Sequence, residues 1–378
     1  MCLSDPSCDS RPNRIIHLLL GLKISVDVAS FPSSTKLPVG NFEFKEPSST
    51  LTARIFRIFL VCLGSIFTRG HKYLSPLAER INELRIGLST FDRQLLKRSY
   101  NIIVVEDLYL LPFAFRMKKD ARIIFDAREY YPMQKEESLF FNLFNRPFVE
   151  YLCSNYLHRC NALFTVSSGL ADRYMLEYNI EMKVLMSTPF MNQKLLPNPS
   201  KQFIRLVHHG AASKNRKIEK MIDVVCDLDD RFTLDFYLVG NKKYITKLQN
   251  YARFCDRIKF FDPVSFDQIV PMLNNYDIGF FYVEPSTFNL LNCLPNKFFE
   301  FIQARLAVAI GPSPNMAEFV NKYKCGFISN KFTTDSMIET LANLTPKQID
   351  TAKANSHLAA SELCWENESE KLIQVLNN

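Results

Sequence analysis

The stretch "LPNKFFEFIQARLAVAIGPSP", residues 294–314, joins a turn, a helical segment and an apolar run. Pro295 and Asn296 predict the turn. Lys297 and Glu300 then fall three residues apart on the first helical turn, where their side chains are neighbours. The apolar run that follows predicts a buried strand of a parallel sheet. Two interpretations fit the charges: a surface ion pair at a helix start, or a pocket that binds a nucleotide by its phosphates and its ribose.

The composition indicates a globular protein. The chain has 378 residues, 47% of them hydrophobic and 22% charged, which predicts two domains rather than one core. Its ten cysteines include no C-x-x-C pair, so we expect neither a zinc site nor a disulfide framework, and a reducing compartment. The first residues lack the basic start and apolar run of a secretory signal. We expect a cytoplasmic protein that does not bind nucleic acid.

Positive charge is concentrated in residues 51–98, which hold nine Lys or Arg and three acidic residues, a net charge of +6 against +7 for the whole chain. The segment includes the apolar run "IFRIFLVCLGSIF" (55–67), which contains Arg57 and which we expect to be too short to cross a membrane. An apolar helix beside basic residues suits an anionic surface, so a peripheral position on the inner face of the cytoplasmic membrane is one prediction. A solvated helical face is the alternative.

Short β-rich runs alternate with helix-compatible segments, which is typical of parallel α/β units. We therefore predict an α/β fold with two doubly wound Rossmann-like domains facing a central cleft. The expected strands are 24–31, 101–107, 122–128, 162–168 and 183–189 in the first half, and 203–210, 234–240, 257–263, 277–283 and 306–312 in the second. The expected ranges are 1–190 for the N-terminal domain, 191–202 for a linker, 203–350 for the C-terminal domain, and 351–378 for a C-terminal helix packing back toward the first domain.

A second candidate phosphate site precedes the first by about ninety residues. In "VHHGAASKNRKIEKMIDVV" (207–225) a strand ends at Gly210, a short loop follows and a helix begins. Backbone N–H groups and the helix dipole converge at such a junction, and Arg216 is close enough in sequence to clamp a diphosphate. The alternative is a simple turn with a solvated basic cluster. The side chain of His208 or of His209 could face a ligand bound at this junction, although a histidine at a strand end is more often structural.

These segments resemble, in order along nearly the whole chain, the retaining GT-B glycosyltransferases of glycosyltransferase family 4, especially bacterial enzymes of surface-polysaccharide assembly. The most specific match is residues 294–301, which are similar to the donor helix L-P-N-K-x-x-E-Y. The other matches are "DSRPNRIIHLLL" (9–20), "IIFDAREYYP" (123–132), "LFTVSSGLADRYMLEYNI" (163–180), "HHGAASKNRKIEKMI" (208–222) and "CWENESEKLIQVL" (364–376).

The resemblance implies a role for each matching position. Arg216, Lys297 and Glu300 would be the catalytic residues, the two cations holding the donor diphosphate and the carboxylate holding the ribose. Gly210 would let the backbone approach the phosphates. Asn296 and Asn292 would also line the donor site. The resemblance further implies a hexosyltransferase that needs neither a metal nor a cofactor, with a donor that is UDP- or GDP-linked.

The N-terminal domain would bind the acceptor, a lipid-linked molecule or a saccharide. Asp126 and Glu129, at a strand end, are the candidate acceptor-side residues. Among the departures from the family pattern, Asn292 replaces the first glutamate of E-x7-E, Ala211 follows the loop glycine, and Arg128 replaces the histidine of D-x-H-E. Because of these departures, a non-catalytic GT-B sugar-binding or scaffold protein is an alternative, and a nucleotide-sugar 2-epimerase is a more distant one.

Overall fold

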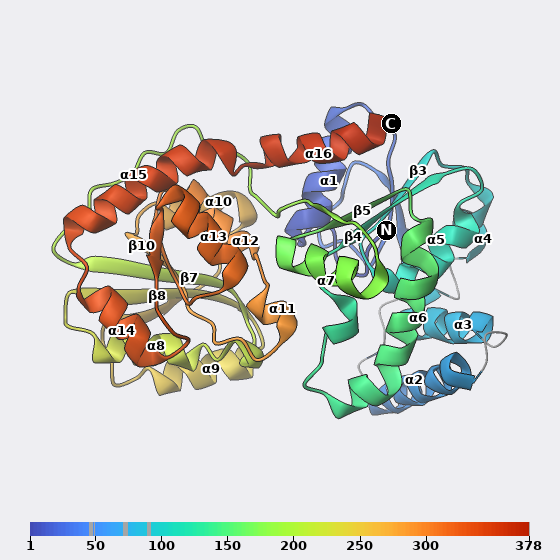
Figure 1. Cartoon of the computed structure of the whole chain (residues 1–378), viewed down its shortest axis with the longest axis horizontal. Helices are drawn as coiled ribbons and strands as arrows, with labels where there is room; N and C mark the ends of the chain where they lie inside the picture. Colours follow the sequence, from blue (N-terminus) through green and yellow to red (C-terminus); the bar gives the residue numbers. More distant parts are fainter. Residues whose placement is uncertain (45–47, 49, 71–74, 89–91, 378) are drawn as a thin grey trace. The chain divides into compact units, whose positions relative to one another are not determined.

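A computed structural model describes residues 1–44, 48, 50–70, 75–88 and 92–377 (Figure 1). The chain divides into two compact units. Met1–Leu185 and Val375–Asn378 form what we call the N-terminal unit, and Met186–Gln374 form the C-terminal unit. The expected linker, 191–202, thus falls inside the C-terminal unit.

The N-terminal unit holds two parallel sheets. One pairs β1 (Asp27–Ser30) with β2 (Gly40–Glu43), and the other has the order β3-β4-β5-β6. Its strands are β3 (Ile102–Val105), β4 (Arg122–Ala127), β5 (Ala162–Thr165) and β6 (Lys183–Val184). The helices are α1 (Ser10–Gly21), α2 (Leu51–Gly70), α3 (Ser75–Ile86), α4 (Asp92–Lys97), α5 (Leu111–Met117), α6 (Arg146–Tyr156) and α7 (Ser168–Tyr178).

The C-terminal unit is built on one six-stranded parallel sheet of order β12-β11-β10-β7-β8-β9. The strands are β7 (Ile204–Ala212), β8 (Phe232–Gly240), β9 (Ile258–Phe261), β10 (Ile278–Phe281), β11 (Ala307–Ile310) and β12 (Gly326–Ile328). The helices are α8 (Glu219–Asp227), α9 (Lys242–Tyr251), α10 (Phe266–Leu273), α11 (Phe288–Leu291), α12 (Asn296–Gln303), α13 (Pro314–Tyr323), α14 (Thr334–Ala342), α15 (Pro346–Glu362) and α16 (Trp365–Asn377).

The predicted fold class is confirmed in its parallel α/β character, since all the strand pairs of both units run parallel. Each of the ten expected strands overlaps an observed one. The sequence analysis did not anticipate β2 and β12, which are short and lack a continuous apolar run. The last residues of α16 lie against β4, because the guanidinium of Arg122 donates to the carbonyls of Val375 and Leu376 at 3.0 and 2.6 Å.

The structure corrects the expectation for the apolar run near residue 60. The helix there, α2, is longer than the run, and its segment Leu51–Thr68 has a mean hydropathy of 1.7 with only 17% of it buried. By length and composition, α2 is the one helix in the described part of the chain that is long and apolar enough to cross a membrane. A core helix of a soluble protein can have the same length and hydropathy, so these two properties alone are weak evidence for a membrane span.

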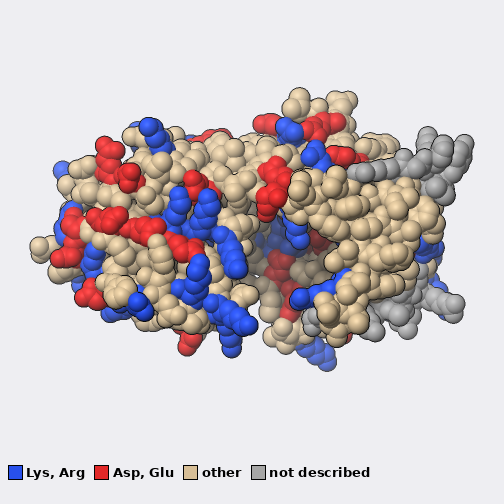
Figure 2. Space-filling view, turned by 90° about the horizontal axis from the view of Figure 1, so that it is seen from below, with Lys and Arg blue, Asp and Glu red and all other residues tan. Residues whose placement is uncertain are grey.

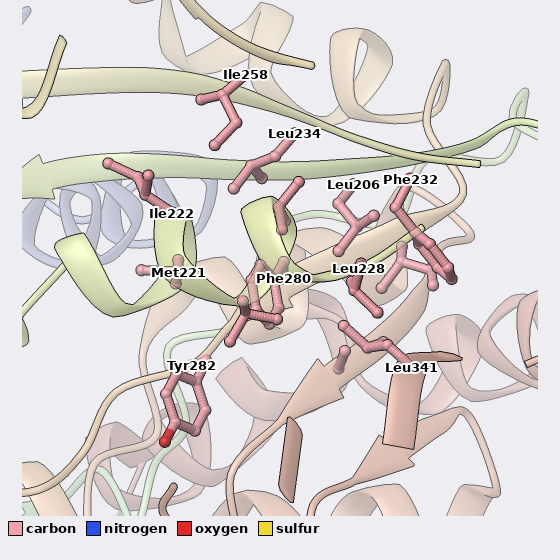
Figure 3. Close-up of a cluster of buried hydrophobic side chains, with 14 of the residues drawn as sticks. Leu206, Met221, Ile222, Leu228, Phe232, Leu234, Ile258, Phe280, Tyr282 and Leu341 are labelled. Carbon is pink, nitrogen blue, oxygen red and sulfur yellow. The ribbon is translucent and has the colours of Figure 1, made fainter. Parts of the chain in front are cut away.

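The sheet of the C-terminal unit packs on α8 in a buried core. Leu206, Leu234 and Phe280 of neighbouring strands pack with Met221 and Ile222 of α8 in a fully buried cluster (Figure 3). On α12, the side chains between Lys297 and Gln303 are all buried. The packing of these side chains holds α12 in place. It also buries the two charged residues near the start of the helix, Lys297 and Glu300.

We expect Gly279→Ala to destabilise the protein, because a Cβ at Gly279 in β10 would lie 2.1 Å from the ring of Phe301 on α12. Relieving this overlap must move α12, at an expected cost of about 1–3 kcal/mol in the free energy of unfolding. Urea unfolding measures the change. Gly21→Ala is the matched control, since nothing lies within 4 Å of its added methyl group. Equal stability of the two variants would contradict the close packing of α12 on β10.

Candidate functional site

In the C-terminal unit, the carboxyl end of β7 meets the first turn of α12. Gly210, near the end of β7, has a φ of +103°, which L side chains rarely adopt. A Cβ built on it would lie 3.1 Å from Nζ of Lys297. Gly210 therefore permits both the backbone turn and the approach of the lysine, and the structure brings these two predicted donor-site residues together.

Lys297 is buried, with 5% of its surface exposed. Its ammonium group donates to the carbonyl of His209 and lies 3.2 Å from Nε2 of His208. It also sits 5.1 Å from the centre of the Phe281 ring, within the range of a cation–π contact. The ammonium is thus held by neutral groups of β7 and β10.

The contacts of His208 determine which of its nitrogens carries the proton. Nδ1 lies 2.8 Å from the carbonyl oxygen of Phe280, which can only accept, so Nδ1 carries hydrogen. Burial, followed by the charge of Lys297, lowers the pKa of His208 well below its usual value, so the ring is neutral. Its Nε2 is then an acceptor for the ammonium group. The imidazole of His208 connects the backbone of β10 to Lys297 and fixes the position of the lysine ammonium group.

A second cation faces the first. Arg216 ends the short helix Lys214–Arg216 after β7, and its guanidinium donates to the carbonyl of Ala211 at 3.4 Å. Burial, followed by the positive charge of Arg216, lowers the pKa of Lys297 well below its usual value, while Glu300 opposes the shift. Among the described residues, no carboxylate lies within ion-pair distance of either cation. A buried and a half-buried positive charge held together in this way favour the binding of an anion.

Glu300 is buried beside the lysine, with 7% of its surface exposed. One carboxylate oxygen lies 3.2 Å from Nε2 of His209, without the alignment of a hydrogen bond. Asn296 is the first residue of α12, directly before the lysine. Asn292 is buried after α11, where its amide donates to the carbonyl of Phe288 and its oxygen accepts from Asn315.

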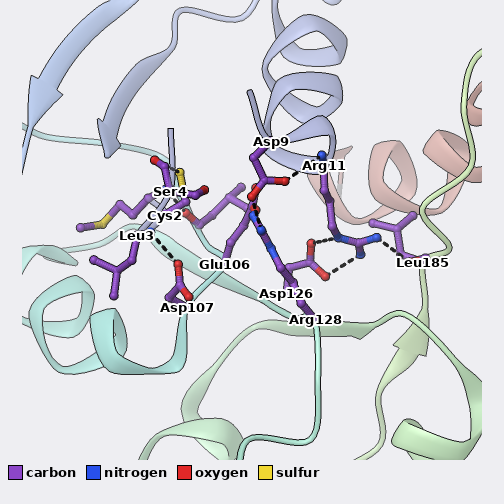
Figure 4. Close-up of polar contacts among 12 residues, drawn as sticks. Cys2, Leu3, Ser4, Asp9, Arg11, Glu106, Asp107, Asp126, Arg128 and Leu185 are labelled. Carbon is purple, nitrogen blue, oxygen red and sulfur yellow. Dashed lines mark hydrogen bonds and ion pairs between the residues drawn. The ribbon is translucent and has the colours of Figure 1, made fainter. Parts of the chain in front are cut away.

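The two candidate acceptor residues lie in the N-terminal unit. Asp126, on β4, is buried in a two-pronged ion pair with Arg11 of α1, with N–O distances of 2.5 and 2.6 Å (Figure 4). Glu129 follows β4, half-buried, and accepts a hydrogen bond from Gln134 at 2.5 Å. Burial raises the pKa of Glu129 to about 7. The protonation of Glu129 therefore changes near neutral pH.

Arg128 lies between these two residues and joins two acids from other segments. Its guanidinium pairs with Asp9, which caps α1, and with Glu106 at the end of β3 (Figure 4). Burial raises the pKa of Glu106 to about 7, against the lowering effect of the arginine. The residue that departs from the family pattern thus holds three segments of the N-terminal unit together.

Basic side chains also gather outside the pocket. On the face drawn in Figure 2, lysines and arginines cluster on the part of the C-terminal unit that carries α8 and α9. Lys217 and Lys220 in this region pair with Glu284 at 2.9 and 2.7 Å. Their charge is therefore partly neutralised, in contrast to that of Arg216 and Lys297.

The sequence analysis underrated the two histidines before Gly210. They supply the acceptors for Lys297, and Nε2 of His209 lies 3.2 Å from a carboxylate oxygen of Glu300. The signal was present, since polar residues at the end of a central strand are placed where α/β sheets bind ligands. Arg305 was also unexplained from sequence. It has a φ of +64° and is fully buried, and its guanidinium donates to Asn192 O and His357 Nδ1.

Comparison with protein-family models and with curated protein sequences finds no match. Solved structures do match. HepE from Anabaena, in complex with UDP and glucose, is 13% identical with a TM-score of 0.66, over 100% of this chain and 98% of that one. WaaG, a glycosyltransferase involved in lipopolysaccharide biosynthesis, is 11% identical with a TM-score of 0.59, over 95% and 94%.

A TarM variant from S. aureus, in complex with fondaparinux, α-GlcNAc-glycerol and UDP, is 12% identical with a TM-score of 0.58. The match covers 78% of this chain and 59% of TarM, so the chain spans less than two thirds of that protein's length. At these identities the likeness concerns the fold. The chain has the fold of the GT-B glycosyltransferases, with two Rossmann-like sheets.

Proposed function

We propose that the protein is a retaining glycosyltransferase of cell-surface polysaccharide synthesis, which transfers a hexose from a nucleotide-sugar to a lipid-linked or saccharide acceptor. The observation that carries the proposal is the buried ammonium of Lys297, which stands beside Arg216 and Gly210 and has no carboxylate within ion-pair distance among the described residues. A diphosphate supplies the negative charge that this pocket lacks. The fold, and the UDP bound in HepE and TarM, support the choice of a nucleotide.

The residues suggest how transfer proceeds. The bond between the sugar carbon and the diphosphate oxygen breaks, and the acceptor hydroxyl forms a new bond to that carbon on the same face. The hydroxyl proton passes to a phosphate oxygen of the leaving group, so no protein base is required. Lys297 and Arg216 stabilise the charge that develops on the diphosphate, and Glu300 holds the ribose hydroxyls. This scheme needs no metal ion.

The first test is nucleotide binding by calorimetry, without added metal, using UDP, GDP, ADP and CMP. We expect one diphosphate to bind selectively. Glu300→Ala is expected to weaken that binding by about 10- to 100-fold, the loss of hydrogen bonds to a charged acceptor. It should also abolish discrimination between the ribose and the 2′-deoxyribose forms. Glu339→Ala, at an exposed position on α14, is the matched control. Unchanged discrimination in Glu300→Ala would contradict the ribose contact.

We further propose that α2 binds the enzyme to the inner face of the cytoplasmic membrane, close to a lipid-linked acceptor. The helix exposes a row of large apolar side chains to solvent, and Arg54 and Arg57 lie among them. Apolar insertion and attraction to anionic headgroups act together in such a helix. The exposed apolar residues are Leu51, Ile55, Phe56, Ile58, Phe59 and Ile66.

We expect the protein to sediment with vesicles that contain anionic lipid, and less so as salt rises. The double substitution Phe56→Ser and Phe59→Ser should weaken binding at least about tenfold, because two aromatic rings no longer insert. Phe203→Ser with Phe254→Ser, which are exposed on the C-terminal unit, is the control. Binding that resists both salt and alkaline extraction would indicate that α2 spans the membrane instead. If the protein does not sediment with vesicles of any lipid composition, both surface binding and a membrane span are excluded.

A non-catalytic GT-B protein is the second candidate. Asn292 favours it, because an amide engaged with Phe288 and Asn315 stands where the family resemblance expects a glutamate near the transferred sugar. Nucleotide binding without sugar transfer or donor hydrolysis, over a panel of lipid and saccharide acceptors, would support this candidate.

A further inference from the structure

The two sheets of the N-terminal unit are separated by a cavity. It has a volume of about 550 Å³ and is lined by residues 24–29, which overlap β1, and by residues 98–104, which overlap β3. The other described strands of the unit each pair into one of the sheets. The cavity therefore interrupts what would otherwise be one continuous parallel sheet.

The first residues of the chain occupy one end of this gap. The amino group of Met1 donates to the carbonyl of Val104 at 2.7 Å, and the carbonyl of Met1 accepts from the N–H of Glu106 at 3.0 Å. On the other side, the N–H of Cys2 donates to the carbonyl of Ala29 at 3.1 Å. One residue bonds to β3 and the next to β1, which is the hydrogen-bond pattern of a strand parallel to both.

This pattern fixes a register, with Met1 opposite Val105. Residues joined to the nitrogen of Met1 would continue the same line into the cavity. At one residue per step, about four of them reach residue 101 on one side and residue 25 on the other. Both residues line the cavity, and the lining continues only as far as Arg98 and Ile24.

The backbone groups on both sides are oriented to receive such a strand. The carbonyls of Val26 and Ser30 accept bonds from β2 and from the residue after it, so by alternation Asp27 and Ala29 face the cavity. Among the described residues, the N–H and C=O of Asp27 and the N–H of Ala29 have no hydrogen-bond partner. These groups line the cavity, and a backbone group that is buried there without a hydrogen-bond partner is costly.

Backbone groups of β3 also face the cavity without partners in the sheet. The carbonyl of Asn101 accepts from β4, so Ile102 and Val104 face the cavity. Within the described part of the chain, nothing bonds to either backbone group of Ile102 or to the N–H of Val104. An inserted strand of about four residues makes about eight ladder hydrogen bonds with the two sides.

The lining indicates the chemistry of the occupant. Apolar side chains reach the cavity from α1, from α4 and from α5. They are Ile15, Ile16, Leu19, Leu95 and Met117. A parallel strand covered by helices reads as a continuous apolar run rich in β-branched residues.

We infer that the cavity is the seat of a further strand: an extended, apolar segment of about four residues, joined to the nitrogen of Met1 and parallel to β1 and β3. The bond to Met1 follows from the observed ladder. An amide nitrogen makes the same hydrogen bond to Val104 as the ammonium does, and it places no charge inside the sheet. A separate peptide would have to end against that charge.

The test compares three full-length proteins: the chain beginning at Met1, a form extended before Met1 by four alternating valine and isoleucine residues, and a form extended by four serine and asparagine residues. Amide hydrogen exchange is read at Ala29 and Val104, with Ile103, which faces β4, as the internal reference. We expect the apolar extension alone to slow exchange at Ala29 and Val104 by about 100-fold and to raise the melting temperature.

Three results would overturn the inference. One is unchanged exchange at both amides in the apolar form. Another is slow exchange at both in the chain beginning at Met1, since the cavity would then be closed in solution. The third is an equal effect from a free valine-isoleucine peptide at about 10 μM, which would show a docking site for a separate chain, because a tethered segment acts at a far higher effective concentration.

Discussion

Lys297→Met is expected to lower the affinity for nucleoside diphosphate by about 100-fold or more. Methionine keeps the length and the apolar stem of lysine and removes only the charge that the diphosphate needs. The helix that carries the residue is held by its other side chains, which are buried from Phe298 to Gln303. Calorimetry against the nucleotide selected by the wild type measures the loss. Lys347→Met, on the exposed side of α15, is the matched control.

The pH dependence of wild-type binding is the second readout for the same residue. In the empty site the pKa of Lys297 is depressed, and a bound diphosphate raises it, so the complex holds more protons than the separated partners. Affinity should therefore be highest below the pKa of the empty site and fall as pH rises through it. Measurements above about pH 7.5 avoid titration of the ligand's own phosphate. Full affinity in Lys297→Met, with an unchanged pH profile, would exclude the lysine from the donor site.

Asp126→Ala is expected to reduce the free energy of unfolding by about 3–5 kcal/mol. The substitution leaves the guanidinium of Arg11 buried, with the Leu185 carbonyl as a neutral partner at 2.9 Å. Leaving one charge buried without its partner costs more free energy than the intact ion pair contributes to stability. Removing only Asp126 is therefore strongly destabilising. Urea unfolding, followed by circular dichroism, measures the change. Asp120→Ala, at an exposed position, is the control.

The double variant Arg11→Met, Asp126→Leu separates the charge effect from packing. Apolar side chains of similar size remove both desolvation penalties, so it should recover most of the stability lost in Asp126→Ala. A double variant less stable than the single one would show that Asp126 contributes packing rather than charge pairing. If Asp126 also contacts the acceptor, the double variant loses transfer activity while remaining folded, and the two roles are thereby distinguished.

The sequence by itself determined the elements and their chemistry. Apolar runs bounded by polar residues located ten strands, because burial on both faces of a parallel sheet demands such runs. The positions of Lys297 and Glu300 on one helical turn follow from the helix period alone. The N-cap of α1 is also a local feature. The side chain of Asp9 accepts a hydrogen bond from the backbone N–H of Arg11, two residues later, and this contact does not depend on the rest of the chain.

Tertiary structure decided which of these local features meet. The sheet order sets β7 beside β10, and this arrangement brings His208 against Phe280 and under Lys297, although these residues are far apart in the sequence. The ion pair of Arg11 and Asp126 is likewise a contact across 115 positions. No local pattern encodes such distances, because strand order depends on how several crossovers pack together. The same packing buries the lysine with no carboxylate at ion-pair distance in the described part of the chain, and that property makes it a candidate phosphate ligand rather than half of a surface ion pair.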